Sequence, residues 1–353
     1  MWMYSLRRIL YNIPIFLAIV FVMMAALRIQ NPVYAYLGKS PTPEEIAAKE
    51  HEFGLDRPFL VQYAAFVADF VRMPYKVVAY QMAIRERDAA AARGEPPPPP
   101  SNTKVVRSWE SNIPVVELIA KSVPPSLALT VPALVLTAAL AIVIGLVSAF
   151  NRGRAIDRTL MVLSVLGMSI SYLVYIIFGQ YWGAYLPQQH GHNIFAVSVD
   201  AGAGNSWDFF LRPKNWVYYC LLPVIISTVV ALGYDTRFYR AVMVEETSRD
   251  YIRTARAKGA SERRVMFVHM LRNALIPIIT RIMITLPFLI TGALLLEYYF
   301  GIPGMGRTLI NAVRAQDFPV IQTFVAILSL LFILSNILTD ILYALVDPRV
   351  TLK

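Results

Sequence analysis

The sequence predicts an all-α polytopic membrane protein, and three observations lead to this fold class. First, 57% of its 353 residues are hydrophobic and only 16% are charged, whereas soluble domains carry roughly a quarter charged residues. Second, the mean hydropathy is +0.52. Third, six apolar runs approach or exceed the ~20 residues that cross a bilayer. Together these observations exclude an ordinary water-soluble protein and predict six transmembrane helices.

The first apolar run extends from Ile9 to Leu27 and follows a pair of arginines. A basic start and an apolar stretch are also typical of a secretory signal peptide. This run is longer than the apolar region of a typical signal peptide, and Arg28 and Asn31 follow it where a cleavage site would have small residues. We therefore predict a retained first transmembrane helix with a cytoplasmic N-terminus.

Five further apolar runs complete the predicted spans. Arg281, Pro277 and Pro287 interrupt the fifth run. We expect Pro277 in the first turn of that helix and a kink at Pro287, where neighbouring helices can satisfy the freed carbonyl. The expected spans are residues 9–27, 126–150, 159–186, 217–235, 275–297 and 318–346.

Basic residues in the short loops indicate the orientation, because cytoplasmic loops retain an excess of Lys and Arg. Three arginines lie in the loop at residues 151–158 and nine basic residues lie at 237–273, whereas the opposing short loops carry two each. We therefore predict that both termini are cytoplasmic (N-in, C-in). The net charge of +10 then reflects topology, and no nucleic acid partner is expected.

A long external segment is predicted between the first two spans. Its acidic and basic residues nearly balance, and long loops cross the membrane largely regardless of charge. Pro43 and the acidic residues after it predict a helix start in the stretch 42–73, and the tract Pro96–Pro100 predicts a stiff polyproline spacer. We expect residues 1–121 to hold the first span and this segment, and residues 122–346 to form the transmembrane domain.

The loop before the fifth span contains the most informative pattern. Thr247 or Ser248 is a suitable N-cap, and the residues from Asp250 onward are mostly helix formers. Gly259 can adopt the left-handed conformation that ends a helix, and Ser261 can cap the next one. The pattern predicts two helices that meet at a sharp corner at Gly259.

A short capped helix that stands off the membrane is suited to docking against another protein. The alternative is that its arginines only satisfy the charge bias of cytoplasmic loops and touch lipid headgroups. That alternative explains the charge, but it does not explain why the cap, the small-residue face and the glycine occur together. The docking hypothesis concerns ten residues, namely Asp250, Tyr251, Ile252, Arg253, Thr254, Ala255, Arg256, Ala257, Lys258 and Gly259.

These ten residues resemble the coupling loop of permeases in binding-protein-dependent ABC transporters, specifically the dipeptide/oligopeptide and nickel branch. The general family pattern is Glu-Ala-Ala, three residues, Gly, nine residues, then Ile-x-Leu-Pro. The chain keeps Ala255 and Gly259 but has Arg253 and Thr254 at the positions of Glu and the first Ala. After the glycine, residues 272–277 read Arg-Asn-Ala-Leu-Ile-Pro, which is similar to the peptide branch.

Further segments strengthen the resemblance, which covers most of the chain except roughly residues 74–104 and 188–213. They are similar to the first external loop, the start of the second span, the turn after the fifth span and the closing signature of that branch. These segments are residues 53–63, 122–129, 296–306 and 340–349.

The resemblance implies the type-1 importer transmembrane fold and a division of labour. Two permease subunits, more often a homologous heterodimer than a homodimer, would form the pathway for peptides or similar small solutes. Two cytoplasmic ATPase subunits would receive the coupling helices, and an external substrate-binding protein would deliver the substrate. The chain itself would need no cofactor, because its partners would bind ATP. The expected location is the plasma membrane of a prokaryote, which is the inner membrane in a Gram-negative cell.

Residues 301–308 nearly match the phosphate-binding loop of ATPases, with Arg307 in place of the lysine. A true loop of this kind follows a β-strand in a cytosolic domain, whereas this one follows a predicted span and is expected on the external side. We therefore predict a tight glycine turn and no ATPase site in this chain.

Four ionisable residues lie in or beside the predicted spans, namely Asp235, Arg281, Glu297 and Asp340. Charges inside a membrane are costly and often mark a transport pathway. Local structural pairing is the other explanation, and the sequence leaves both open.

Two other classes of function remain as alternatives. A secondary transporter or channel would work without an ATPase, and an intramembrane enzyme would need paired carboxylates, a Ser/His dyad or a metal cluster at membrane depth. The single cysteine, Cys220, and the pair His190 and His192 lack the partners of a metal site. We expect neither catalytic residues nor a bound metal.

Overall fold

The computed structural model describes residues 2–29, 31–37, 40–93, 105–199, 212–291 and 293–346. These ranges form helices and turns with a single isolated β-bridge. The chain divides into two compact units. The larger unit comprises residues 1–10, 121–307 and 331–353, and the smaller unit comprises residues 11–120 and 308–330.

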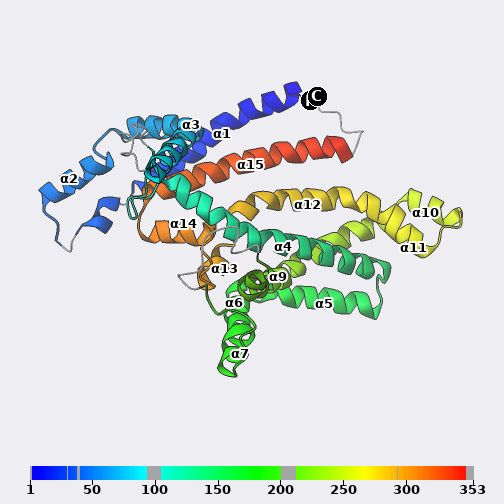
Figure 1. Ribbon diagram of the computed structural model, residues 1–353. Coiled ribbons are helices and arrows are strands. Elements are labelled where there is room, and N and C mark those ends of the chain that lie inside the picture. Colours follow the sequence, from blue (N-terminus) through cyan, green and yellow to red (C-terminus); the bar gives the residue numbers. More distant parts are fainter. Residues whose placement is uncertain are drawn as a thin grey trace. The chain divides into compact units, whose positions relative to one another are not determined.

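Five helices in the described ranges are long and apolar enough to cross a membrane, and a sixth span results if a bent helix pair is counted as one. The all-α polytopic fold class is therefore confirmed. The five helices, which Figure 1 labels, are α1 (Trp2–Leu27), α4 (Val115–Phe150), α9 (Pro213–Thr247), α12 (Leu271–Thr291) and α15 (Phe318–Val346).

The third span is not the continuous helix expected at residues 159–186. Instead, α5 (Ala155–Ser169) and the stretch from α6 (Tyr172–Gln180) to α7 (Leu186–Gln189) meet at 88°. The break lies at Ile170, which is extended (φ −85°, ψ 134°) and interrupts the helical hydrogen bonds. The Tyr175 hydroxyl then donates to the Gly167 carbonyl at 3.0 Å, which satisfies an acceptor at the end of α5.

Other spans also have different ends from those expected, and α4 begins at Val115 and not at residue 126. Helix α9 extends to Thr247, about three turns past the predicted limit at residue 235, so that the expected loop begins inside a helix. Helix α12 ends at Thr291, and a separate short helix, α13 (Leu294–Tyr299), follows in place of a span that continues to 297. Figure 1 shows α9 and α12 reaching the same end of the larger unit, where α10 and α11 lie.

Two hydrophobic cores are found among the described residues of the larger unit. One contains Leu129 of α4, Ile176 of α6 and Leu222 of α9. The other contains Leu146 near the end of α4, Met243 near the end of α9, and residues of the loop before α12. The long helices α4 and α9 therefore contribute to both cores, and this links the two ends of the unit.

In the smaller unit, the expected helix start at Pro43 is confirmed. Thr42 and Glu45 form a reciprocal capping box at the start of α2 (Pro43–Phe53), and α3 (Phe59–Ala92) follows. The expected polyproline spacer lies outside the described residues.

Asp317 joins distant parts of the smaller unit. Its buried carboxylate accepts hydrogen bonds from the Ser108 hydroxyl at 2.5 Å and from the Trp109 backbone N–H at 3.1 Å. Trp109 in turn stacks on Phe53 of α2, with ring centroids 4.0 Å apart, and on Phe318 at 5.6 Å. The Asp317 carboxylate therefore orders the loop that contains Ser108 and Trp109. The Trp109 ring in this loop packs against α2 and against the start of α15.

We expect the substitution Asp317→Ala to destabilise the protein, because it leaves buried donors without an acceptor at a cost of about 1–3 kcal/mol. The thermal midpoint of the purified protein measures this. Glu52→Ala is the matched control, because the Lys49–Glu52 pair is exposed and such pairs contribute little. Equal midpoints in the two variants would contradict this role of Asp317.

Candidate functional site

The ten residues that the sequence singled out form a helix and a corner after the end of α9. Helix α10 spans Asp250–Ala257, and α11 (Glu262–Arg264) leads through a π-helical turn at Val265–Met270 into α12. The expected N-cap at Thr247 or Ser248 is wrong. Their hydroxyls donate to carbonyls of the preceding turn at 2.6 and 2.7 Å and so close α9, while Arg249 occupies the N-cap of α10 without a side-chain hydrogen bond.

The corner at Gly259 is confirmed in detail. Gly259 has φ +80°, its N–H donates to the Arg256 carbonyl at 2.9 Å, and the Ala260 N–H donates to the Ala255 carbonyl at 3.1 Å. This pair of bonds is the Schellman motif, which requires a left-handed residue that glycine adopts at little cost. Ser261 then caps α11 by accepting a hydrogen bond from the Arg264 N–H.

Helix α10 has one held face and one exposed face. Ile252 and Ala255, with exposed fractions of 1% and 7%, lie in the core that the ends of α4, α9 and α12 form. On the other face, the side chains of Asp250 and Arg253 are 96% and 77% exposed and lie 3.8 Å apart. Five more residues are exposed, namely Thr254, Arg256, Ala257, Lys258 and Gly259.

Polar contacts fix both ends of α10. The Arg256 guanidinium donates to both carboxylate oxygens of Glu262 at 3.0 and 3.1 Å, across the Gly259 corner. At the other end, the Tyr251 hydroxyl donates to Glu246 of α9 at 2.5 Å. Burial, together with this hydrogen bond, raises the pKa of the Tyr251 hydroxyl to about 12, so the donor stays protonated at physiological pH.

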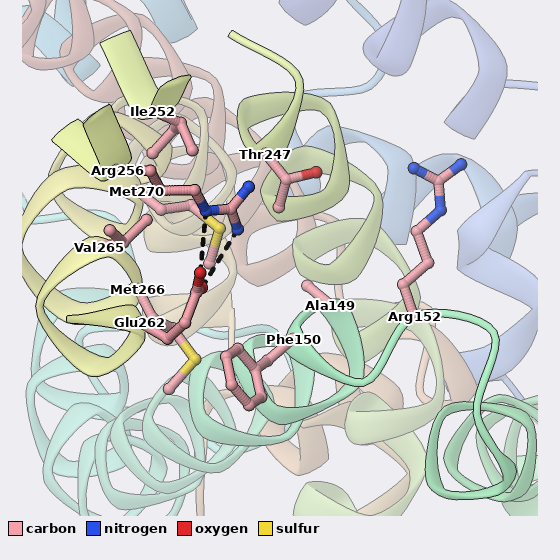
Figure 2. A pocket seen from close by; sticks show the side chains of 10 residues that line it. All are labelled: Ala149, Phe150, Arg152, Thr247, Ile252, Arg256, Glu262, Val265, Met266 and Met270. Carbon is pink, nitrogen blue, oxygen red and sulfur yellow. Dashed lines mark hydrogen bonds and ion pairs between the residues drawn. The ribbon is translucent and has the colours of Figure 1, made fainter. Parts of the chain in front are cut away.

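A cavity of about 230 Å³ separates α10 from the end of α4. Figure 2 shows the Arg256–Glu262 pair on one wall and Phe150 and Arg152, from the end of α4 and the following turn, on the other. Its lining is mixed, with the two arginines and Glu262 beside Met266 and other apolar side chains. The contact between α10 and α4 is therefore incompletely packed.

A buried ion pair that sequence reasoning missed ties α5 to α9. Arg240 donates to the two carboxylate oxygens of Asp157 at 2.6 and 2.7 Å. The Ser148 hydroxyl and the Gly153 N–H complete the acceptor capacity of Asp157, whose side chain is 4% exposed. The available signal was a single acid among the arginines of the loop at 151–158.

Comparisons with known proteins show the family of the chain. Residues 141–352 match the family model described as the binding-protein-dependent transport system inner membrane component, and residues 1–83 match the model of the N-terminal part of such membrane components. The glutathione transport system permease protein of Salmonella choleraesuis is 32% identical over 99% of both chains.

The chain belongs to this family of transport permeases. Further relatives are a putative peptide transport system permease protein of Brucella abortus, 30% identical over 98% of both chains, and a dipeptide transport system permease protein of Alkalihalophilus pseudofirmus, 28% identical over 98% of both chains. The protein is therefore a permease subunit of a binding-protein-dependent ABC importer.

In this permease, Glu297 is fully buried at the glycine turn that resembles a phosphate loop. Its carboxylate accepts from the Ser126 hydroxyl at 2.7 Å and from the Gly306 N–H at 2.7 Å, at the start of α14 (Met305–Arg314). Backbone amides that a phosphate would need are thus occupied by a carboxylate of the same chain. A phosphate loop follows a β-strand, whereas this turn follows the helix α13.

The remaining candidate charges are placed as follows. Asp235 of α9 and Arg281 of α12 pair with each other at 3.3 Å, and Arg281 also lies over the Phe238 ring at 5.9 Å. Asp340 belongs to α15, but its side chain lies outside the described residues. The structure therefore pairs two of the four charges across two spans and gives Glu297 a helix-capping position.

A double-mutant cycle tests the Asp157–Arg240 pair in the permease. Each single substitution, Asp157→Leu or Arg240→Met, leaves one charge without its partner and is expected to cost about 3 kcal/mol, the lower end for buried pairs, because Arg240 is a quarter exposed. The double substitution is expected to cost less than the sum. Additive losses of thermal stability would contradict the coupling.

Gly304 is expected to tolerate no side chain. A Cβ atom there would lie 2.3 Å from the Glu297 carboxylate and 2.6 Å from the Ser126 hydroxyl. We expect Gly304→Ala to reduce the yield of folded, monodisperse permease severely. In Gly167→Ala, the control, the nearest atom is 3.9 Å from the added Cβ, and near-normal yield is expected. A normal yield for Gly304→Ala would show that the Glu297 network is not constrained as described.

Proposed function

We propose that this permease carries peptides or similar small solutes and that α10 receives the movement of a cytoplasmic ATPase. The observation that carries the proposal is the two-faced character of α10. Its inner face is fixed in a core made from three membrane helices, and its outer face is exposed and charged. Such an element can transmit a push on its outer face to the ends of the spans.

The energetics support transmission through α10. Burial of an isoleucine side chain contributes about 1.5–3 kcal/mol, which holds α10 to the core. The hydrogen-bonded corner at Gly259 makes the joint between α10 and α11 stiff, so that a force on α10 is transmitted and not absorbed there. An ATP-driven movement could therefore bias the helix bundle between two states, provided that the ATPase contacts α10 differently in each.

The proposed partners follow from the family. A second, homologous permease subunit would complete the pathway, two ATPase subunits would bind ATP, and an external binding protein would deliver the substrate. The chain would then need neither an ATPase site nor a cofactor of its own. We place it in the plasma membrane of a prokaryote, which is the inner membrane in a Gram-negative cell.

The proposed substrate class rests on the names of the relatives. Three of them are described as transporting peptides, dipeptides or glutathione, and all three substrates contain peptide bonds with charged ends. Shared chemistry of this kind supports a short peptide as the solute. Uptake of labelled di- and tripeptides into cells that express the full transporter tests it, and uptake no greater than in cells without this permease would contradict it.

Gly259→Val is expected to lower transport several-fold and to weaken the dependence of ATP hydrolysis on substrate, because a β-branched residue costs about 1–3 kcal/mol at a positive φ. The measurements are peptide uptake and ATP hydrolysis by the reconstituted transporter. Gly191→Val is the matched control, because Gly191 also has φ +80° but lies in the loop after α7, away from α10. Normal coupling in Gly259→Val would refute the role of the corner.

Charge exchange separates two roles of Arg256. Arg256→Glu alone repels Glu262 and is expected to impair transport. If Arg256 acts by holding the corner, the exchange Arg256→Glu with Glu262→Arg restores most of the uptake, because the pair is re-formed. If Arg256 contacts the ATPase, the exchange does not restore it. Membrane insertion is checked by the amount of permease in isolated membranes, and full activity of Arg256→Glu would exclude both roles.

A further inference from the structure

Helix α3 of the smaller unit is apolar along much of its length, but only the apolar face of its first half is covered. There, Phe59, Tyr63, Phe66 and Phe70 pack against α1. The helix beyond Phe70 carries an exposed stripe at a spacing of three to four residues, which is the period of a helix. Its members Val71, Tyr75, Val78 and Met82 have exposed fractions of 71%, 78%, 50% and 63%.

The contacts of the covered face place α3 at membrane depth. The most apolar part of α1 extends from Leu10 to Leu27, with a mean hydropathy of 2.3. Within it, the Phe16 ring lies 5.6 Å from Phe70, and the Leu17 carbonyl accepts a hydrogen bond from the Tyr63 hydroxyl at 2.9 Å. Since these α1 residues lie inside the span, the α3 residues that touch them lie inside the membrane as well.

The polar groups of α3 are compatible with that depth. Asp69 and Lys76 form an ion pair at 2.7 Å, and the Gln62 amide donates to the Leu55 and Arg57 carbonyls at the start of the helix. Arg72 lies between Asp69 and Lys76 and is exposed, and the long apolar stem of an arginine lets its guanidinium reach the lipid headgroups. A denser run of charges, Arg85, Glu86, Arg87 and Asp88, follows Met82. The exposed apolar stripe therefore ends before this run of charges.

A shallow groove between α1 and α3 supports the same placement. Its volume is about 540 Å³, and it is lined by Leu17 of α1 and by Tyr63, Val67 and Val71 of α3, together with two alanines and Arg72. Exposed apolar side chains on α1 include Ile15 and Val22. A largely apolar groove beside a membrane span fits an acyl chain.

We propose that residues 59–82 of α3 are embedded in the membrane beside α1 and that their uncovered stripe faces lipid acyl chains. The sequence predicted that the segment between the first two spans is wholly external. In this proposal, part of that segment is anchored in the bilayer. The inference does not depend on the proposed substrate or on the role of α10.

Site-directed spin labelling of the full-length chain in phosphatidylethanolamine and phosphatidylglycerol vesicles tests this placement. Cys220 is the only cysteine and is buried, so Cys220→Ala provides the background. Labels are introduced separately by Val71→Cys, Val78→Cys and Met82→Cys, so that the result does not depend on one variant. Val22→Cys on α1 serves as the lipid control and Glu44→Cys on α2 as the water control.

Collisions of each label with oxygen, which enters lipid, and with a nickel chelate, which stays in water, are measured. At the three α3 positions we expect an oxygen-to-nickel collision ratio that matches Val22→Cys and exceeds Glu44→Cys by roughly tenfold, since the acyl region excludes the charged chelate. Ratios like that of Glu44→Cys would overturn the placement in favour of an external helix. Protection from both reagents would overturn it in favour of a protein partner on the stripe.

Discussion

Burial of Ile252 and Ala255 against the ends of three membrane helices is the interaction on which the proposed docking surface of this permease depends. These two side chains hold α10 to the larger unit, and the Schellman corner at Gly259 and the Arg256–Glu262 pair hold its far end. The outward charges are thereby presented from a fixed element. Without the buried anchor, the same residues would form a mobile basic loop, and a force on them would not reach the spans.

The path from α10 into the membrane consists of close, satisfied contacts. Gly145 lets α4 approach α9 so closely that a Cβ atom at residue 145 would lie 3.1 Å from the backbone nitrogen of Arg240. The ion pair between Asp157 and Arg240 connects α5 to α9. Such contacts favour movement of the helix ends together, because breaking a buried pair is costly. The cavity between α10 and α4 is the exception, and it provides space for side chains to repack when α10 moves.

Sequence reasoning succeeded where the determinants are local. The six apolar runs, the corner at Gly259, the cap at Ser261 and the start of α2 at Pro43 each depend on residues within one or two turns. It failed where long-range contacts decide. Nothing in the apolar run at 159–186 signals the break at Ile170, and Asp157 and Arg240 are 83 residues apart. Likewise, the capping role of Glu297 depends on α14 folding back onto α13, which no short pattern reveals.

The central claim, that the exposed face of α10 contacts the ATPase, is tested most directly by site-specific cross-linking. Arg253→Cys in the Cys220→Ala background carries a thiol-to-amine cross-linker in the assembled transporter, and His192→Cys, in the loop after α7, is the control. The account predicts a covalent product between the permease and the ATPase from Arg253→Cys and none from His192→Cys. An intact complex that yields no such product from Arg253→Cys, or equal products from both positions, would contradict it.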